Sequence, residues 1–587
     1  MDGSYREKGQ RQKGFTPEQV ACLVDALGKL ELQNLFQAGG GTQAAPAPEA
    51  VHGTPLEDLC KEEVAKYKLH PLDLWERLEH WTAKNEIATG LDQFLLRHLG
   101  FFNVEPTSPG YMVRLRIPAC RLRGDQMLAL AAIAETFGGG YAHVTTRGNI
   151  QIREIEPKDV LNVIDALNEA GLSCQGSGAD SARNMTASPT AGFDRLELID
   201  LSPFTRRLSN LVLNTRELRA LPRKFNISFD NGGTISCVAD SNDIAFQAVE
   251  IGEGAGLEPG IYCRIGLGGI SGHRDLTRET GMVCTPEQSV MAGYAMLHVF
   301  CEHADRTNRK KARLKYLLDR EGVDWFIART QEKLDALDAG FRLTPLSSEH
   351  DRPRPTVDRQ AHIGAHPQRQ DGLSYVGIAL EMGRLSPAQM RVIGRLAMET
   401  GDNDLRLTVW QNLLIPHLPA ARMAEVETAL AEAGLATSAT AFAAGAVGCT
   451  GKAGCKLALA YTKEDGTALV RHLESRFTLD QPINIHLTGC PNSCAQHYIG
   501  DIGLMGATLP DGSEGYYVVL GGGSDGDKGV GRPLCGPIPS TGINAVIEGV
   551  IAHYLAEREA GETFLSFVRR TEDAALPALL SPLDLAS

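Results

Sequence analysis

The chain has 587 residues, and 58 lysines and arginines against 72 aspartates and glutamates give it a formal net charge of −14. Without a long Lys/Arg block, this acidic balance excludes nucleic acid as a general partner. Thirteen cysteines are too few for a secreted disulfide scaffold. The length exceeds a single hydrophobic core and predicts about three or four units.

Neither a leader nor a membrane segment is predicted. The N-terminal stretch MDGSYREKGQRQKGF is charged and polar where a signal peptide carries an apolar core. No apolar run reaches the roughly eighteen residues that a spanning helix needs. We therefore expect a soluble cytoplasmic protein without a membrane partner, and we expect a monomer.

Two segments of the chain resemble each other. One begins at Tyr111 and reads YMVRLRIPACRLRGDQMLALAAIAETFGGGYAHVTTRGNIQI; the other begins at Tyr375 and reads YVGIALEMGRLSPAQMRVIGRLAMETGDNDLRLTVWQNLLI. Both patterns predict strand, turn, helix, loop and strand, and we match Thr146 with Thr408 at the final strand. Such self-similarity predicts an internally duplicated α+β module.

The helices of the two segments carry apolar residues at helical spacing. The expected core positions are Leu130, Ile133, Ala134 and Phe137 in the first helix and Ile393, Leu396 and Ala397 in the second. Ser386 followed by Pro387 predicts the N-cap and first position of the second helix. The segment 345–372 is poor in large apolar residues and predicts a linker.

Basic residues gather around the first segment and beyond it. Arg114 and Arg116 alternate on its first strand and therefore project to one face. The further candidates are Arg147, Arg153, Arg183, Arg223 and Lys224. Charged residues are mostly solvated, which is the simplest interpretation. However, a buried guanidinium needs an anionic partner, and few acidic residues lie beside these. The pattern thus favours an acid-rich cofactor or an anionic substrate.

Four cysteines form two tight clips, GCTGKAGCK with Cys449 and Cys455, and TGCPNSCAQH with Cys490 and Cys494. Two clips can close a four-thiolate cage, and the surrounding glycines allow sharp turns. Free cysteines are often ordinary buried side chains, and zinc sites favour gaps of about two to four residues. The longer first gap favours an iron-sulfur cluster over zinc.

With TTRGNIQ, LPRKFN, CTGKAGC and TGCPNSCAQHYIGDIGL in this order, the chain resembles the sirohaem-containing nitrite and sulfite reductases from about Trp75 to Arg570. The resemblance implies a pseudo-two-fold α+β fold with ferredoxin-like half-domains and sirohaem/iron-sulfur-binding domains. The segments expected from it are an N-terminal extension (1–70), a first ferredoxin-like repeat (71–180), a first sirohaem-binding domain (181–345), a linker (346–370), a second ferredoxin-like repeat (371–440) and a 4Fe-4S and sirohaem-binding domain (441–587).

The resemblance also implies a set of site residues. Cys449, Cys455, Cys490 and Cys494 would hold a [4Fe-4S] cluster, and Cys494 would also bridge to the sirohaem iron. The implied sirohaem anchors are Arg116, Arg147, Gln151, Arg223 and one of Arg313 or Lys315. The implied catalytic residues are Arg114, Arg183, Lys224 and Asn226. Cys120, Cys535 and the first seventy residues receive no role.

The implied reaction is the six-electron reduction of nitrite to ammonium. Fixed cations would stabilise charge on oxygen, and Lys224 would relay protons if its cationic neighbours lower its pKa. Sulfite-specific relatives tend to carry a lysine at the position of Asn226, so one charge fewer favours monoanionic nitrite. The alternatives are an assimilatory sulfite reductase, a sirohaem-family oxygenase of corrin biosynthesis, and a non-catalytic binding protein stabilised by zinc.

An electron donor is also implied, because the chain lacks a flavin domain and a convincing dinucleotide fingerprint. Reduced ferredoxin is the expected donor, with flavodoxin as the alternative. An acidic ferredoxin would need a basic patch, for which the run RTNRKKARLKY offers Arg306, Arg309, Lys310 and Lys311. The same run is equally typical of a solvated helix face.

Overall fold

The computed structural model describes residues 50–354 and 357–580. The chain divides into two compact units, residues 1–56 and 57–587. Of the first unit, the described part is a short hairpin of β1 (Ala50–Val51) and β2 (Thr54–Pro55) with the start of the next turn. All further structure belongs to the second unit. No helix in the described ranges is long and apolar enough to cross a membrane.

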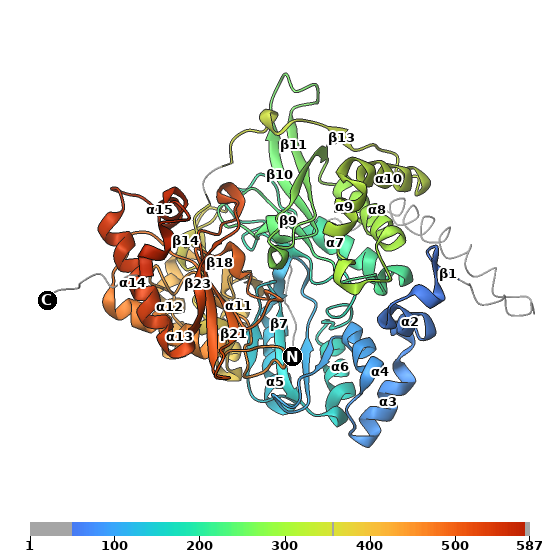
Figure 1. The fold of residues 1–587 in the computed structure, drawn as a ribbon, viewed down its shortest axis with the longest axis horizontal. Helices are drawn as coiled ribbons and strands as arrows, with labels where there is room; N and C mark the ends of the chain where they lie inside the picture. Colours follow the sequence, from blue (N-terminus) through green and yellow to red (C-terminus); the bar gives the residue numbers. More distant parts are fainter. Residues whose placement is uncertain (1–49, 355–356, 581–587) are drawn as a thin grey trace, which may run out of the picture. The chain divides into compact units, whose positions relative to one another are not determined.

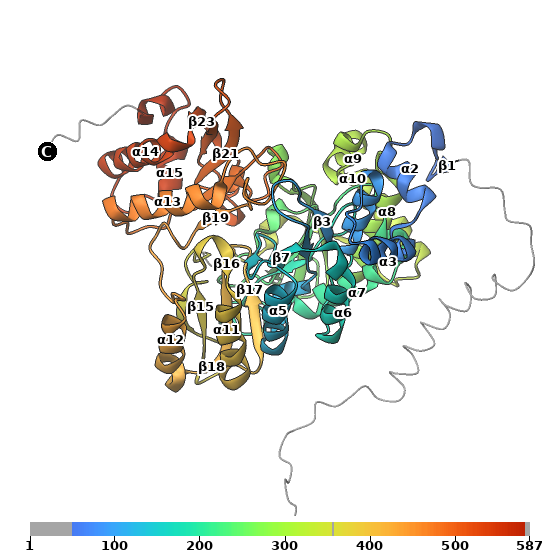
Figure 2. The same cartoon turned by 90° about the horizontal axis from the view of Figure 1, so that it is seen from below.

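Two similar half-domains lie beside each other in the second unit, with α5 (Gly124–Thr136) next to α11 (Pro387–Thr400) (Figure 2). The sheet of the first has the order β16 (Arg384–Leu385), β6 (Ala142–Val144), β7 (Ile150–Ile155), β4 (Tyr111–Arg114) and β3 (Phe101–Asn103). The sheet of the second has the order β14 (Gly364–Pro367), β15 (Leu373–Ile378), β18 (Leu413–Pro419), β17 (Asp404–Leu407) and β5 (Arg121–Arg123). Their helices are α5 and α6 (Val160–Glu169), then α11 and α12 (Met423–Glu432). The predicted duplication is confirmed.

The two half-domains exchange strands. Strand β5 comes from the first segment but pairs with β17 of the second, with Leu122 opposite Leu405. In return, β16 of the second segment pairs with β6 of the first, with Leu385 opposite Ala142. Separating the halves would therefore break hydrogen bonds in both sheets.

The helices α5 and α11 lie against each other, and a single apolar core continues through both half-domains. A Cβ atom on Gly124 would lie 2.5 Å from the carbonyl oxygen of Gly394, so only glycine permits this approach. The predicted core faces of both helices are buried, apart from Phe137 at the end of α5. Ser386 caps α11, because its Oγ accepts from the Gln389 N–H in a capping box.

The two remaining sheets share one topology. One has the order β13 (Thr344–Pro345), β12 (Arg278–Cys284), β11 (Gly260–Leu267), β10 (Ile244–Ile251), β9 (Ile227–Asp230) and β8 (Thr186–Ala187). The other has the order β19 (Ala446–Gly448), β20 (Ile485–Thr488), β21 (Ile502–Thr508), β22 (Glu514–Leu520) and β23 (Arg532–Pro539). In each, the first three strands in chain order are parallel and the next two antiparallel. The duplication therefore extends to these domains.

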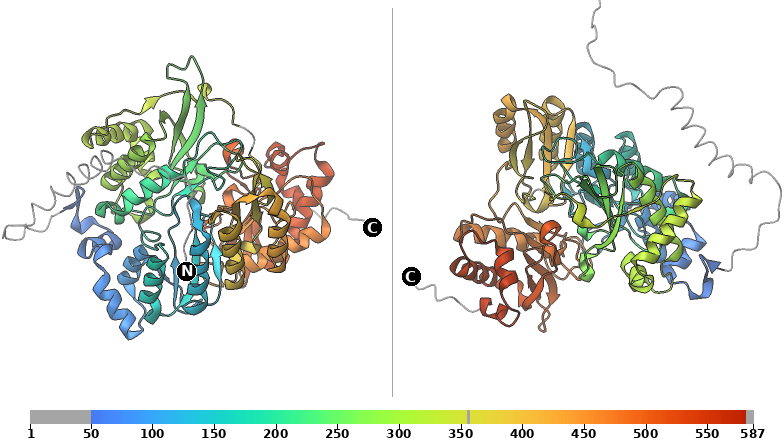
Figure 3. Two further views of the ribbon diagram at one scale, coloured as in Figure 1. Left: turned by 180° about the vertical axis from the view of Figure 1, so that it is seen from behind. Right: turned by 90° about the horizontal axis from the view of Figure 1, so that it is seen from above.

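Helices cover each of these sheets and close two separate cores. The first domain carries α7 (Ser202–Leu213), α8 (Gln288–His303), α9 (Leu314–Glu321) and α10 (Val323–Ala336). The second carries α13 (Thr462–Arg476), α14 (Ile543–Glu557) and α15 (Phe564–Arg570). Figures 1 and 3 show α8 and α10 side by side next to the long green strands β10 and β11.

Two segments that were predicted as a linker and an N-terminal extension contain regular secondary structure. Residues 364–367 of the predicted linker form β14, which pairs with β15 at the edge of a sheet, Gly364 opposite Gly377. Within the predicted N-terminal extension, residues 1–49 lie outside the described residues, whereas Lys61–Lys68 form helix α2, followed by α3 (Trp75–Lys84) and α4 (Gly90–Leu96). Glu63 and Lys66 of α2 are buried. Segment boundaries otherwise stay a prediction.

Candidate active site

The two cysteine clips lie at neighbouring strand ends. Cys449 follows β19 and Cys490 comes two residues after β20, and these strands are parallel neighbours. The backbone N–H of Cys449 donates to the Leu487 carbonyl at 3.0 Å. The N–H of Gly489 donates to Cys449 Sγ at 3.2 Å. Because the carboxyl ends of parallel strands meet at one edge of a sheet, the fold brings the clips together as the spacing predicts.

Glycines allow the sharp turns of both clips. Gly451 has a φ of +69°, and a Cβ there would lie 2.6 Å from the Thr462 backbone nitrogen. In the second clip, a Cβ on Gly489 would lie 2.7 Å from the Ala458 Cβ. A side chain at Gly451 or Gly489 would therefore push its loop outward. The turns therefore require glycine, as the sequence pattern indicated.

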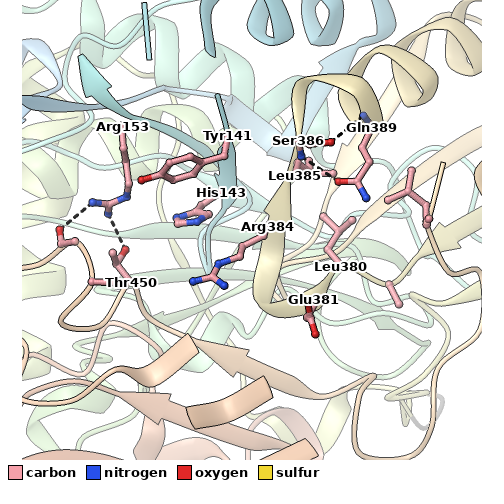
Figure 4. Close-up of a pocket in the computed structure, with 15 residues that line it drawn as sticks. Tyr141, His143, Arg153, Leu380, Glu381, Arg384, Leu385, Ser386, Gln389 and Thr450 are labelled. Carbon is pink, nitrogen blue, oxygen red and sulfur yellow. Dashed lines mark hydrogen bonds between the residues drawn. The ribbon is translucent and has the colours of Figure 1, made fainter. Parts of the chain in front are cut away.

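Arg153 fastens the first clip to the half-domain. From β7, its Nη1 donates to the Gly454 carbonyl at 2.8 Å and its Nη2 to Thr450 Oγ1 at 2.7 Å and Gln151 Oε1 at 3.1 Å (Figure 4). Arg153 was recognised in the sequence only as a flanking basic residue. Its i, i+2 spacing from Gln151 on one strand was the available signal.

The second clip is joined to the first half-domain as well. Thr146, in the β6–β7 loop, donates from Oγ1 to the Cys494 carbonyl at 2.8 Å. Cys490 is buried, whereas Cys494 is exposed. Cys494 is therefore the thiol of this clip that is open to a further group.

The four thiols act on one another electrostatically. Burial raises the pKa of Cys449 to about 11, with a further contribution from Cys494. Burial also raises the pKa of Cys490, and Cys494 and Cys455 add to the shift. Across residues 50–354 and 357–580, however, no three His, Cys, Asp or Glu side chains converge to hold a single metal ion. Four thiols that act on one another electrostatically suit a bulky cluster in which each iron takes one thiolate.

A group of cations faces this region. Arg114 and Lys224 have no ion pair or hydrogen bond from their side chains to any described residue; the Arg114 guanidinium lies 4.6 Å from the centre of the Phe102 ring. Burial lowers the pKa of Arg114 to about 10, and Cys494 opposes that shift. Burial and Arg313 lower the pKa of Lys224 to about 7, again opposed by Cys494.

Arg183 and Arg147 complete the cation group. Arg183 donates to the Ala179 carbonyl at 2.7 Å and to the Ser177 carbonyl at 3.3 Å. Burial and Arg114 hold its pKa well below the usual range. Arg147 Nη1 donates to Asn242 Oδ1 at 3.0 Å. The side-chain amide of Asn226 is oriented so that its nitrogen donates to the Phe225 carbonyl at 3.3 Å and its oxygen accepts from Arg147 Nη2 at 3.2 Å.

The other predicted sirohaem anchors differ in how many hydrogen bonds they already make to protein groups. Arg116 donates to Ser209 Oγ and to the carbonyls of Gly176 and Ala182, which leaves its Nη2 without a partner among the described residues. Gln151 is held by Arg153. Arg223 donates to the Arg309 carbonyl at 3.3 Å and is 28% exposed.

The choice between Arg313 and Lys315 stays open. Arg313 makes two hydrogen bonds to Asp243, at 2.7 and 3.2 Å. Lys315 pairs with Asp275 at 2.6 Å and Asp319 at 3.1 Å. Both cations thus already have carboxylate partners in the protein.

The donor set suits a cofactor rich in carboxylates. Cations repel one another at Arg114, Arg147, Arg183 and Lys224, and the buried Nε of Arg183 and Nη2 of Arg116 have no partner in the described ranges. Unpaired buried donors are costly unless an anion binds them. The residues present therefore fit sirohaem, whose many carboxylates would supply acceptors.

Sequence reasoning missed Asp180, and it misread Arg306 and Arg309. Asp180 is fully buried, makes two hydrogen bonds to Arg309 at 2.5 and 2.8 Å, and lies 3.7 Å from Arg223. Arg306 is also buried and pairs with Glu63. The predicted docking patch is therefore wrong for Arg306, which is buried, and for Arg309, which is half-buried and neutralised by the buried Asp180. Nothing in the local sequence separates them from the exposed Lys310 and Lys311.

Comparison with known proteins agrees with this architecture. The nitrite and sulphite reductase 4Fe-4S domain matches residues 178–336 and 443–571. The nitrite/sulfite reductase ferredoxin-like half domain matches residues 104–170 and 366–433. The chain belongs to the nitrite/sulfite reductase family and is an oxidoreductase of the kind that carries sirohaem and a [4Fe-4S] cluster.

Individual relatives span nearly the whole chain. The ferredoxin–nitrite reductase of Leptolyngbya laminosa is 34% identical over 88% of this chain and 99% of its own length. The same enzyme of Synechococcus elongatus is 32% identical, covering 84% and 97%. A ferredoxin-named sulfite reductase of Mycolicibacterium paratuberculosis is 30% identical, covering 77% and 83%. The NirA protein of Mycobacterium tuberculosis superposes with a TM-score of 0.79 at 27% identity, covering 88% and 97%.

Proposed function

We propose that the chain is an assimilatory nitrite reductase that converts nitrite to ammonium with electrons from reduced ferredoxin. The observation that carries the proposal is that Arg114 and Lys224, which form no ion pair with any described residue, lie within electrostatic reach of Cys494. An anionic substrate at this position would be held beside the thiol that is open to a second metal group.

Each cysteine has a role in this proposal. Cys449, Cys455, Cys490 and Cys494 would hold the [4Fe-4S] cluster, and the exposed Cys494 would also serve sirohaem. The residues that would hold the sirohaem carboxylates are Arg116, Arg147, Gln151, Arg223 and one of Arg313 or Lys315. When bound, the two groups supply one-electron transfer and an iron that coordinates the substrate. Arg153 positions the first clip through its bonds to Gly454 and Thr450.

The chain's own residues bind the anion and handle protons. Overall, nitrite takes up six electrons and eight protons to give ammonium and two waters. Arg114 and Arg183 stay protonated, so they orient nitrite and stabilise charge on its oxygens. Lys224 has a pKa near 7, so its Nζ can give up a proton at neutral pH and take up another.

Nitrite is preferred over sulfite on the charge of the site. Asn226 contributes a neutral amide facing Arg147, and no second lysine stands there. A site with one positive charge fewer matches a monoanion better than a dianion. The relatives named as nitrite reductases support this choice, whereas the relative named as a sulfite reductase keeps sulfite reduction as the second candidate.

The names of the same relatives support the proposed electron donor. Both cyanobacterial relatives are ferredoxin-dependent by name, which supports ferredoxin over flavodoxin. A cytoplasmic location and a monomeric state stay predictions.

The test is product formation from nitrite alone. Purified holoenzyme with dithionite-reduced methyl viologen should consume six reducing equivalents for each ammonium formed, and reduced ferredoxin should replace the dye. If nitrite is consumed without stoichiometric ammonium, the proposed function is wrong.

A further inference from the structure

A cavity of about 480 Å³ lies where the two half-domains meet the Cys449–Cys455 loop (Figure 4). Tyr141, His143 and Arg153 line it from the first half-domain, and Arg384 is among the residues that line it from the second. Thr450, Ala453 and Gly454 contribute from the loop. None of the four cysteines and none of the proposed nitrite-binding cations belongs to this lining. The cavity is therefore separate from the proposed substrate site.

His143 is a buried polar group that faces this space without a partner. Its side chain comes from β6, the residue is 6% exposed, and neither ring nitrogen makes a hydrogen bond to any described residue. A neutral imidazole offers one N–H donor and one acceptor. Since buried polar groups are nearly always hydrogen-bonded, His143 marks a place for a ligand atom or an ordered water.

The surroundings of His143 are positively charged. Lys463, Arg153 and Arg384 are the charged groups that act on it most strongly, and all three are basic, although burial lowers the pKa of Lys463 to about 7. Lys463 donates to the Met382 carbonyl, and the Nε of Arg153 has no partner in the described ranges. Arg384 lies at the mouth with 43% of its side chain exposed, and pairs with Glu464 through one nitrogen. Figure 4 shows its guanidinium on the same side of the cavity as His143.

The rest of the wall is apolar. Leu380, Leu385 and Leu435 are among the residues that line it, and Figure 4 shows Leu380 and Leu385 across the cavity from Arg153. The one acidic residue in the lining, Glu381, is exposed and pairs with Arg471. The volume falls in the range of small-molecule sites, roughly 300–1,000 Å³, which combine an apolar wall with a few polar groups.

We propose that this cavity binds a small organic monocarboxylate with an apolar body. The carboxylate accepts from the His143 N–H and from Arg384, and the apolar body lies against the three leucines. A charge-assisted hydrogen bond to Arg384 satisfies the donors that Glu464 leaves free. The ligand also contacts Thr450 and Gly454, the two residues of the clip to which Arg153 donates hydrogen bonds. Binding at the cavity therefore restricts the motion of the Cys449–Cys455 loop.

Calorimetric titration of the holoenzyme with 3-phenylpropionate tests the proposal directly. We expect saturable one-to-one binding with a Kd below about 1 mM, a modest affinity for a ligand of this size. The neutral analogue 3-phenylpropanamide should bind at least about tenfold more weakly, because it carries no charge for the cations to meet.

Variants locate the binding. Arg384→Gln, at the exposed mouth, should weaken 3-phenylpropionate about tenfold, and His143→Gln should weaken it further. Arg342→Gln, a control arginine with 73% of its side chain exposed and outside the cavity lining, should change nothing. No saturable binding up to about 10 mM, equal affinity for acid and amide, or equal affinity in Arg384→Gln would each overturn the proposal.

Discussion

The backbone N–H of Gly489 donates to Cys449 Sγ at 3.2 Å, so the residue before Cys490 in the second clip is hydrogen-bonded to the first thiol of the first clip. The contact exists because β19 and β20 are parallel neighbours, which places both clips at the same sheet edge. An N–H that points at sulfur favours the thiolate form. The clips are thus joined by the fold itself.

Replacing the proposed bridging cysteine should disturb both metal groups. In Cys494→Ser, we expect the visible bands of sirohaem and the electron paramagnetic resonance signal of the reduced cluster to be lost or altered together, with nitrite turnover below about 1% of wild type. Cys535→Ser, at a half-buried thiol on β23, is the matched control and should keep both spectra. An unchanged sirohaem spectrum in Cys494→Ser would mean that this thiol is not shared.

Arg153 should determine how firmly the cluster is held. Arg153→Gln removes the bonds to the Gly454 carbonyl and Thr450 Oγ1, and bonds from a charged donor contribute about 1.5–3 kcal/mol each. We expect iron release to a chelator to be at least about tenfold faster, with the cluster spectrum of the freshly purified variant preserved. Arg391→Gln, at an exposed arginine paired with Glu135, is the control. Equal release rates for the variant and wild type would show that Arg153 does not position the clip.

The pKa of Lys224 predicts a pH dependence. Burial and Arg313 lower it to about 7, so the protonated ammonium is lost as the pH rises through that value, and kcat/KM for nitrite should fall above it. Bound nitrite favours the charged form, so the fall in kcat should occur at higher pH.

Lys224→Arg separates charge from proton transfer. Because arginine stays protonated, the fall in kcat/KM near pH 7 should disappear, and kcat should drop about 100-fold if proton transfer is lost. Lys311→Arg, at an exposed lysine, should retain the wild-type profile. A profile for Lys224→Arg that still falls near pH 7 would assign the titration to another group.

The close approach of α5 and α11 predicts a stability effect. A Cβ on Gly394 would lie 2.7 Å from the Gly124 carbonyl oxygen, so Gly394→Val should destabilise the protein by about 2–3 kcal/mol through overpacking. Gly549→Ala in α14 is the control, because its nearest neighbour would be 3.9 Å away and alanine favours helix. Thermal unfolding measures both; an unchanged Tm in Gly394→Val would show that the helices can move apart freely.

Local sequence patterns predicted the parts of the fold that depend on local structure. The apolar faces of α5 and α11, the Ser386 cap and the turns of the cysteine clips all follow from residue spacing and turn chemistry. The match of Thr146 with Thr408 is wrong: the N–H of Thr145 bonds the Asn149 carbonyl as that of Thr408 bonds the Asn412 carbonyl. Two adjacent threonines gave no local signal for the register.

Local patterns could not predict strand pairs or ion pairs between residues that lie far apart in the sequence. The three residues of β5 carry no mark that they pair with β17 of the other half-domain. The charge of Arg309 is neutralised by Asp180, more than a hundred residues away in the sequence. Whether a cation is free for substrate or neutralised inside the protein is decided by such distant partners.

The ratio of kcat/KM for nitrite to kcat/KM for sulfite, measured on one holoenzyme preparation with reduced methyl viologen, tests the central claim most directly. With a neutral Asn226 beside Arg147, we predict a ratio above about 10, a preference of at least 1.4 kcal/mol for the monoanion. A ratio below one would contradict the assignment and identify sulfite as the substrate that the cations around Cys494 select.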